Sequence, residues 1–146
     1  MQRLLFLCTG NYYRSRYAEQ RFNALAPAAG LRWQADSRGL DIAAGVFNVG
    51  PLSPHTIARL HRLGLAPDAP PRFPLQALEA DFAQADLVVA LKEREHRPML
   101  AARFRPWVER VEYWHVDDVD QAHPDDALAL IDAQLERLIL RLARSP

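Results

Sequence analysis

Apolar residues along the chain follow two kinds of pattern, short continuous runs and longer segments with helical spacing. The runs at residues 3–8 (RLLFLC) and 86–91 (DLVVAL) are typical of buried β-strands. Two further strands are predicted at residues 32–37 and 110–114. Apolar positions three and four residues apart predict helices at residues 15–26, 54–63, 75–85, 92–104 and 125–143.

Several boundaries carry their own signals. Ser53 is expected to cap the second helix, with Pro54 in its first position and Gly64 at its end. Pro98 indicates that the helix at 92–104 starts late or is kinked. Residues 38–54 are rich in glycine and show no periodicity, which predicts a long loop, and long loops are uncommon in compact domains unless they are functional.

The alternation of strands and helices predicts the α/β class. We expect one domain over residues 1–146, with a four-stranded, parallel, twisted sheet and helices on both faces. Ligands of such sheets bind beyond the carboxyl ends of the strands. Cys8 lies at one such end and an acidic loop, HVDDVDQAHPDD, follows another.

The charges balance overall but are unevenly placed. Among 146 residues, 18 are Lys or Arg and 18 are Asp or Glu, so no overall field attracts nucleic acid or an anionic membrane. Residues 1–40 hold six arginines and two acids, whereas residues 112–126 hold six acids and no Lys or Arg. This distribution favours a local anion site that faces an acidic loop.

Cys8 is the only cysteine of the chain. This excludes an intramolecular disulfide and indicates a reducing compartment. The apolar run Leu4–Leu7 is too short for a membrane span and lacks the features of a signal peptide. We therefore expect a cytoplasmic protein.

The segment CTGNYYRS joins the first strand to the first helix and suits an anion. Gly10 and Asn11 tolerate positive φ, so the loop can turn its N–H groups inward, where the helix N-terminus adds its own. Arg14 adds a planar fork that matches two phosphate oxygens. The same field favours the thiolate form of Cys8, to which Ser15 could donate a hydrogen bond. A buried, inert cysteine is the alternative, but every neighbour here supports a nucleophile.

The first segment, LLFLCTGNYYRSRYAEQRF, resembles the low-molecular-weight protein tyrosine phosphatase family, in which a Cys-x-Gly-Asn-x-x-Arg-Ser loop follows the first strand. Four later segments, DSRG, FNVGPLSPHTIARLHRLGL, ADLVVALKEREH and VEYWHVDDVD, resemble family segments in the same order. The resemblance implies that Cys8 and Arg14 are catalytic and that Ser15, Asn11 and Ser37 support the loop. The implied phosphate-binding residues are Thr9, Gly10, Asn11, Tyr12, Tyr13, Arg14 and Ser15.

A phosphatase of this kind needs a carboxylic acid that protonates the leaving group. Asp117, Asp118 and Asp120 are the candidates. The resemblance implies an Asp-Pro pair whose Asp lies four residues after a tryptophan, which from Trp114 selects Asp118, with Val119 in place of the proline. Asp117 remains the alternative.

The family often has tyrosines just after this pair, and Asp120 and Gln121 stand there instead. Phe47 and Tyr12, together with Tyr13, could supply an aromatic wall for the substrate. An acidic rim at residues 117–126 would disfavour acidic substrates by repulsion.

We therefore expect a phosphomonoester hydrolase that acts through a cysteinyl-phosphate without metal or cofactor. The expected partner is a phosphorylated substrate, either a phosphotyrosine protein or a small aryl phosphate. The alternative is a phosphate-binding or phosphocysteine-carrier module without hydrolysis. Thioredoxin-coupled arsenate reductases share this fold, but a single cysteine disfavours their chemistry. A metal site at His115 and His123 is disfavoured because the ligand spacing is irregular.

The remaining charged, histidine and tryptophan residues are not expected to take part in the chemistry. Glu19 is expected on a solvated helix face, as are the arginines at positions 94, 97, 103 and 105. His55, His61 and His96 are expected to be at the surface or partly packed. Trp33, Trp107 and Trp114 are expected to pack in the core or at its edge.

Overall fold

The computed structural model describes residues 1–67 and 70–144. Its sheet contains β1 (Gln2–Cys8), β2 (Trp33–Gly39), β3 (Leu87–Ala90) and β4 (Glu112–Tyr113). These strands are parallel and lie in the order β2-β1-β3-β4. The predicted α/β fold with a four-stranded parallel sheet is confirmed.

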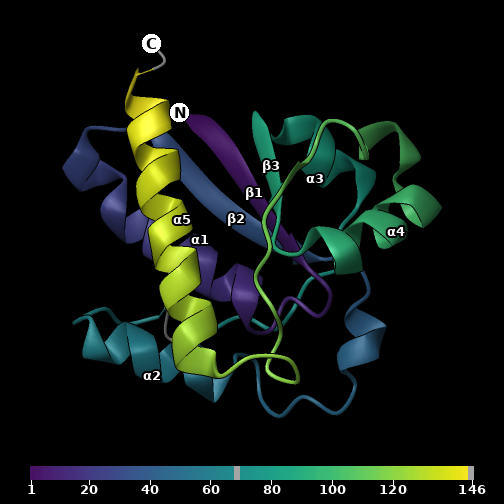
Figure 1. Cartoon of the computed structure of the whole chain (residues 1–146), viewed down its shortest axis with the longest axis horizontal. Helices are drawn as coiled ribbons and strands as arrows, with labels where there is room; N and C mark the ends of the chain where they lie inside the picture. The colour runs from purple at the N-terminus through teal and green to yellow at the C-terminus, as the bar shows by residue number, and fades with distance from the viewer. Residues whose placement is uncertain (68–69, 145–146) are drawn as a thin grey trace.

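Helices cover both faces of the sheet (Figure 1). Side chains of β1 alternate, so Leu4, Phe6 and Cys8 join one core cluster, whereas Leu5 and Leu7 join a second. The first cluster packs against α1 (Arg14–Leu25), α2 (Pro54–Arg62) and α5 (Pro124–Arg144), and the second against α3 (Glu79–Gln84) and α4 (Glu93–Arg103). Three short 3-10 helices complete the elements, at Pro27–Ala29, Ile42–Gly45 and Arg105–Trp107.

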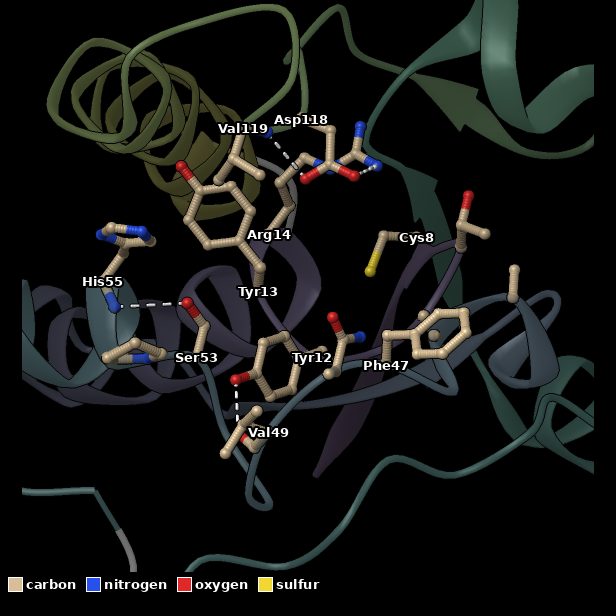
Figure 2. Close-up of a pocket in the computed structure, with 16 residues that line it drawn as sticks. Cys8, Tyr12, Tyr13, Arg14, Phe47, Val49, Ser53, His55, Asp118 and Val119 are labelled. Carbon is tan, nitrogen blue, oxygen red and sulfur yellow. Dashed lines mark hydrogen bonds and ion pairs between the residues drawn. The ribbon is translucent and has the colours of Figure 1, made fainter.

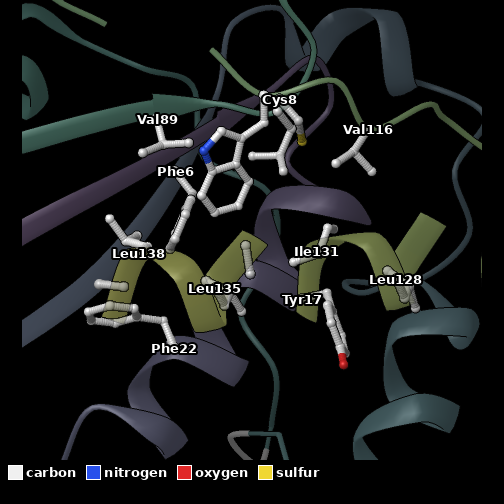
Figure 3. Close-up of a cluster of buried hydrophobic side chains, with 14 of the residues drawn as sticks. Phe6, Cys8, Tyr17, Phe22, Val89, Val116, Leu128, Ile131, Leu135 and Leu138 are labelled. Carbon is white, nitrogen blue, oxygen red and sulfur yellow. The ribbon is translucent and has the colours of Figure 1, made fainter. Parts of the chain in front are cut away.

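The apolar stripe of α5 explains how the longest helix is held. Leu128, Ile131, Leu135 and Leu138 recur at helical spacing and are at most 2% exposed, so one face of the helix is buried against the sheet (Figure 3).

Helix α2 begins as expected, because the Ser53 hydroxyl accepts a hydrogen bond from the His55 N–H. Among the described residues, no helix has the length and apolar character needed to cross a membrane.

Two expected boundaries were wrong, and one of two alternatives at Pro98 is excluded. The helix predicted at 75–85 begins only at Glu79, because residues 75–77 pair with the end of β2 through backbone hydrogen bonds to Gly39. The strand predicted at 110–114 is reduced to Glu112–Tyr113. Helix α4 begins at Glu93 with Pro98 in its interior, so the late start is excluded, and buried Leu100 anchors the turn that follows.

The carboxyl ends of three strands meet at one edge of the sheet. Cys8 ends β1, Leu91 and Lys92 follow β3, and the acidic loop follows β4. Backbone N–H groups of Trp114 and Val116 donate to Ala90 and Leu91, which ties the acidic loop to the neighbouring strand. The topology therefore brings the two predicted halves of the site together.

Candidate active site

Cys8 lies at the base of the turn between β1 and α1, and its thiol points into a cavity of about 460 Å³ (Figure 2). Its Sγ is 2.8 Å from the Ser15 Oγ. Asn11 adopts a left-handed φ of 51°, and its amide donates to the Oγ atoms of Ser15, at 2.8 Å, and Ser37, at 2.9 Å. Because Ser15 Oγ accepts from Asn11, its own O–H is left to donate to Cys8.

Arg14 opens α1 beside this thiol and is only 2% exposed. Its Nη1 donates to the Val116 carbonyl, at 2.9 Å, and both terminal nitrogens donate to the carboxylate of Glu95. Burial opposes its charge, but the hydrogen bond to Glu95 and the charges of Cys8, Glu95 and Asp118 raise the pKa of Arg14 above its usual value. The guanidinium is thus a permanent cation at the wall of the cavity.

The structure separates the two candidate acids of the loop. Asp118 lines the cavity together with Cys8, and its Oδ2 lies 3.6 Å from Arg14 Nη2. Asp117 forms an ion pair with Lys92 instead and is not among the lining residues in the described chain. In residues 1–67 and 70–144, no three His, Cys, Asp or Glu side chains converge as a metal site would need.

Three exposed apolar side chains lie among the residues that line the cavity. Phe47, Val49 and Val119 line it and are 93%, 83% and 49% exposed. The Tyr12 hydroxyl donates to the Val49 carbonyl at 2.5 Å, which places its ring on the same side as Phe47 (Figure 2). Tyr13 differs, because it is 5% exposed and packs edge-on against His55. Burial and the charge of Asp118 raise the pKa of Tyr13 to about 12, so its hydroxyl stays protonated.

The sequence as a whole also matches a known family. Residues 3–145 match the model of the low molecular weight phosphotyrosine protein phosphatases. The chain belongs to this family. It is accordingly a phosphatase of the low-molecular-weight type, a cysteine-based class of enzyme.

Several solved structures share the fold of this chain. A low molecular weight protein tyrosine phosphatase from T. tengcongensis is 26% identical, with a TM-score of 0.72 over 94% of this chain and 99% of its own. YfkJ from Bacillus subtilis is 25% identical, with a TM-score of 0.81 over 97% and 94%. Wzb from Vibrio vulnificus, solved with benzylphosphonate, is 17% identical, with a TM-score of 0.79 over 96% and 98%. Comparison with curated protein sequences found no match.

Two expectations about polar side chains were wrong. Glu19 is 8% exposed rather than solvated, and it accepts hydrogen bonds from Ser37, at 2.6 Å, and Arg72, at 3.2 Å. His96 is fully buried, with its Nδ1 accepting from the Lys92 N–H. Helical periodicity could not reveal either, because the partner of each polar atom comes from another segment or from the helix entrance.

Sequence reasoning also missed Arg72, which reaches the loop that follows Cys8 from a proline-rich stretch. Its Nη1 donates to the Asn11 Oδ1 at 2.9 Å, and its Nη2 donates to the Ser37 carbonyl at 2.9 Å and to Glu19. No motif marks this residue in the sequence. The loop that holds Cys8 is thus supported by a network in which Asn11, Ser37 and Glu19 are buried and Arg72 is partly exposed.

Replacement Arg72→Met should lower the free energy of unfolding by about 1–3 kcal/mol, because it leaves the buried Glu19 without its cation. Burial raises the pKa of Glu19 despite the hydrogen bond from Ser37 and the charge of Arg72, and removing Arg72 raises it further. The native state then binds a proton that the unfolded state releases, so the loss should be larger at pH 7 than at pH 5. Urea unfolding at both pH values measures this.

The matched control is Arg62→Met, which removes an ion pair with Asp125 whose side chains are 59% and 52% exposed. This change should leave stability nearly unaltered. Equal effects of the two substitutions, or an Arg72→Met loss that does not grow with pH, would contradict a buried network.

Proposed function

We propose that this phosphatase hydrolyses phosphomonoesters through a cysteinyl-phosphate intermediate. The observation that supports it best is that Cys8, Arg14 and Asp118 line one cavity although Asp118 lies more than a hundred residues from the other two. Nucleophile, cation and proton donor are the groups that this chemistry needs. We further propose that residues 1–146 act as one domain and that the enzyme works in the cytoplasm.

In the first step the Cys8 thiolate attacks phosphorus. An S–P bond forms while the bond from phosphorus to the ester oxygen breaks, and Asp118 delivers its proton to the departing oxygen. Residues 9–15 supply backbone N–H groups, and Arg14 a charged fork, to the three equatorial oxygens whose charge is spread in the transition state. Asn11 and Ser37 maintain the loop through the hydrogen bonds described above.

In the second step the Asp118 carboxylate takes a proton from water, and the oxygen of that water attacks phosphorus. The S–P bond breaks and Cys8 leaves as a thiolate, which the hydroxyl of Ser15 stabilises across their 2.8 Å contact. Inorganic phosphate is released and the carboxyl of Asp118 is protonated for the next cycle. This sequence of steps requires no metal or cofactor.

An aromatic ester fits the mouth of the cavity best. Tyr12 and Phe47 lie on one side and Val119 on the other (Figure 2), so a flat ring can be held between apolar surfaces. The acidic residues nearby are largely neutralised, since Asp117 pairs with Lys92 and Asp118 faces Arg14. We therefore propose a phosphotyrosine protein or a small aryl phosphate as the substrate class.

Steady-state release of phosphate from an aryl and an alkyl phosphate tests this proposal. The wild type should prefer the aryl ester, and Phe47→Ala should raise the KM for that ester by about 3–10-fold while leaving the alkyl ester unaffected. Phe73→Ala is the matched control, because Phe73 is also exposed but does not line the cavity. If the wild type shows no catalytic turnover, the proposal that it hydrolyses phosphomonoesters is refuted. If Phe47→Ala affects both esters equally, the proposal that Phe47 contacts an aromatic substrate is refuted.

A phosphocysteine carrier is the second candidate. It would form one equivalent of phosphorylated Cys8 and stop, whereas the enzyme releases phosphate in every cycle. The position of Asp118 in the cavity favours the enzyme, because a carrier gains nothing from a group that activates water.

A further inference from the structure

Glu95 lies behind the phosphate-binding loop, on the first turn of α4. Its Oε1 accepts from Arg14 Nη1 at 3.2 Å, and its Oε2 accepts from Arg14 Nη2 at 2.7 Å. The Thr9 hydroxyl donates to the same Oε2. One carboxylate therefore holds both ends of the loop, although it is 86 residues from Thr9 and 81 residues from Arg14 in the sequence.

The hydrogen bonds of Arg14 within the described residues leave two of its N–H groups unused, and Asp118 Oδ2 lies 3.6 Å from its Nη2. Of the five N–H groups of an arginine side chain, Glu95 and the Val116 carbonyl use both on Nη1 and one on Nη2. The two that remain, on Nε and Nη2, point from the same side of the planar group. These two parallel N–H groups can donate to two oxygens of one phosphate.

We propose that Glu95 is the positioning residue of Arg14, and that it orients the guanidinium so that its Nε–Nη2 edge is presented to the phosphoryl group on Cys8. This role rests on the proposed function. It differs from catalysis, because Glu95 is not among the residues that line the cavity in the described chain, and it acts on the reaction through Arg14.

The competing role is that of an internal inhibitor, a carboxylate that occupies the place of the phosphate. The geometry disfavours it. Glu95 reaches Arg14 from α4 and is not among the described residues that line the cavity, whereas Cys8 and Asp118 both line it. An inhibitor would need to leave before phosphate could bind, while a positioning residue stays in place throughout.

The electrostatic state of Glu95 suits a permanent anchor. Burial favours the neutral acid, but contacts from His96 and Arg14 and the hydroxyl of Thr9 hold the pKa of Glu95 well below its usual range. Glu95 is therefore ionised at any pH at which the enzyme works. Its charge partly cancels that of Arg14, so its removal should strengthen the attraction of the site for anions while loosening the geometry.

Removal of Glu95 should therefore affect anion binding and catalysis in opposite directions, and kinetics can distinguish the two effects. Glu95→Ala should lower kcat by about 10–100-fold, because the fork is no longer aligned with the transition state. KM should not rise, since the lost negative charge favours anion binding. Glu95→Gln keeps the size and one acceptor oxygen and should fall between the wild type and Glu95→Ala.

Glu93→Ala is the matched control. Glu93 lies on the same turn, 40% exposed, and pairs only with Arg97 among the described residues, so its kinetics should match the wild type. An inhibitor would give Glu95→Ala an unchanged or higher kcat with a lower KM, which would overturn the proposal. A purely structural role would lower the melting temperature without changing kcat, which would also overturn it.

A binding measurement separates this proposal from the proposed function. The ratio of the dissociation constants of phosphate and vanadate compares a ground state with a mimic of the transition state and needs no turnover. Both ligands are anions, so the change of charge largely cancels in the ratio. Glu95→Ala should lower this preference for vanadate about tenfold. An unchanged ratio would refute the positioning role, whereas a wild type that releases no phosphate would refute the enzyme alone.

Discussion

Replacement Cys8→Ser is expected to lower phosphate release from an aryl phosphate by at least about 10⁴-fold, because a serine hydroxyl stays protonated where a thiolate would attack. Serine is close in size to cysteine and the site is supported by Asn11, Ser15 and Arg14, so the fold and the binding of phosphate should persist. Steady-state kinetics and calorimetric titration with inorganic phosphate measure the two properties.

The single cysteine supplies an independent check. Alkylation can modify only Cys8, so loss of activity should follow incorporation of one equivalent of reagent, and bound phosphate should protect. Considerable turnover by Cys8→Ser would contradict the cysteinyl-phosphate. So would a wild type in which phosphorylated Cys8 accumulates to one equivalent without release, which is the behaviour of a carrier.

Replacement Asp118→Asn should lower kcat by about 10²–10³-fold with little change in KM, because the amide can neither protonate the leaving oxygen nor activate water. The loss should be greatest for esters whose leaving group most needs a proton, and smaller for an activated aryl ester.

Asp117→Asn is the matched control for this change. Asp117 is adjacent in sequence but pairs with Lys92, so its replacement loosens the loop without removing the acid, and kcat should fall only a few-fold. If Asp117→Asn is the crippling change and Asp118→Asn is not, the acid has been assigned to the wrong residue.

Local patterns were sufficient for the framework and for half of the site. The apolar run before Cys8 predicts a buried strand, and Ser53 with Pro54 predicts the start of α2, because the forces that form these elements act between near neighbours. The spacing from Cys8 to Arg14 lies within one loop for the same reason. The resemblance to the phosphatase family, counted from Trp114, implied Asp118, and the structure places that residue in the cavity with Cys8.

Sequence-based predictions for individual residues were wrong where the hydrogen-bonding partners come from distant segments of the chain. Glu19 is polar on a helix and therefore looks solvated, yet Ser37 and Arg72 enclose it. Residues 75–77 look like the start of a helix, yet they pair with Gly39. The residues next to them in the sequence predict neither the burial of Glu19 nor the pairing of residues 75–77.

The amino-acid sequence by itself determined the α/β framework, and it put forward Cys8 as the candidate nucleophile in a loop suited to an anion, with a shortlist of acids. Only the tertiary structure decided which acid faces Cys8, how Arg72 supports the loop, and that Glu95 holds Arg14 from behind. The physical reason is the range of the interactions. Periodicity, capping and turn formation operate over a few residues, whereas an ion pair such as Arg14–Glu95 joins residues 81 positions apart and exists only once the sheet has assembled.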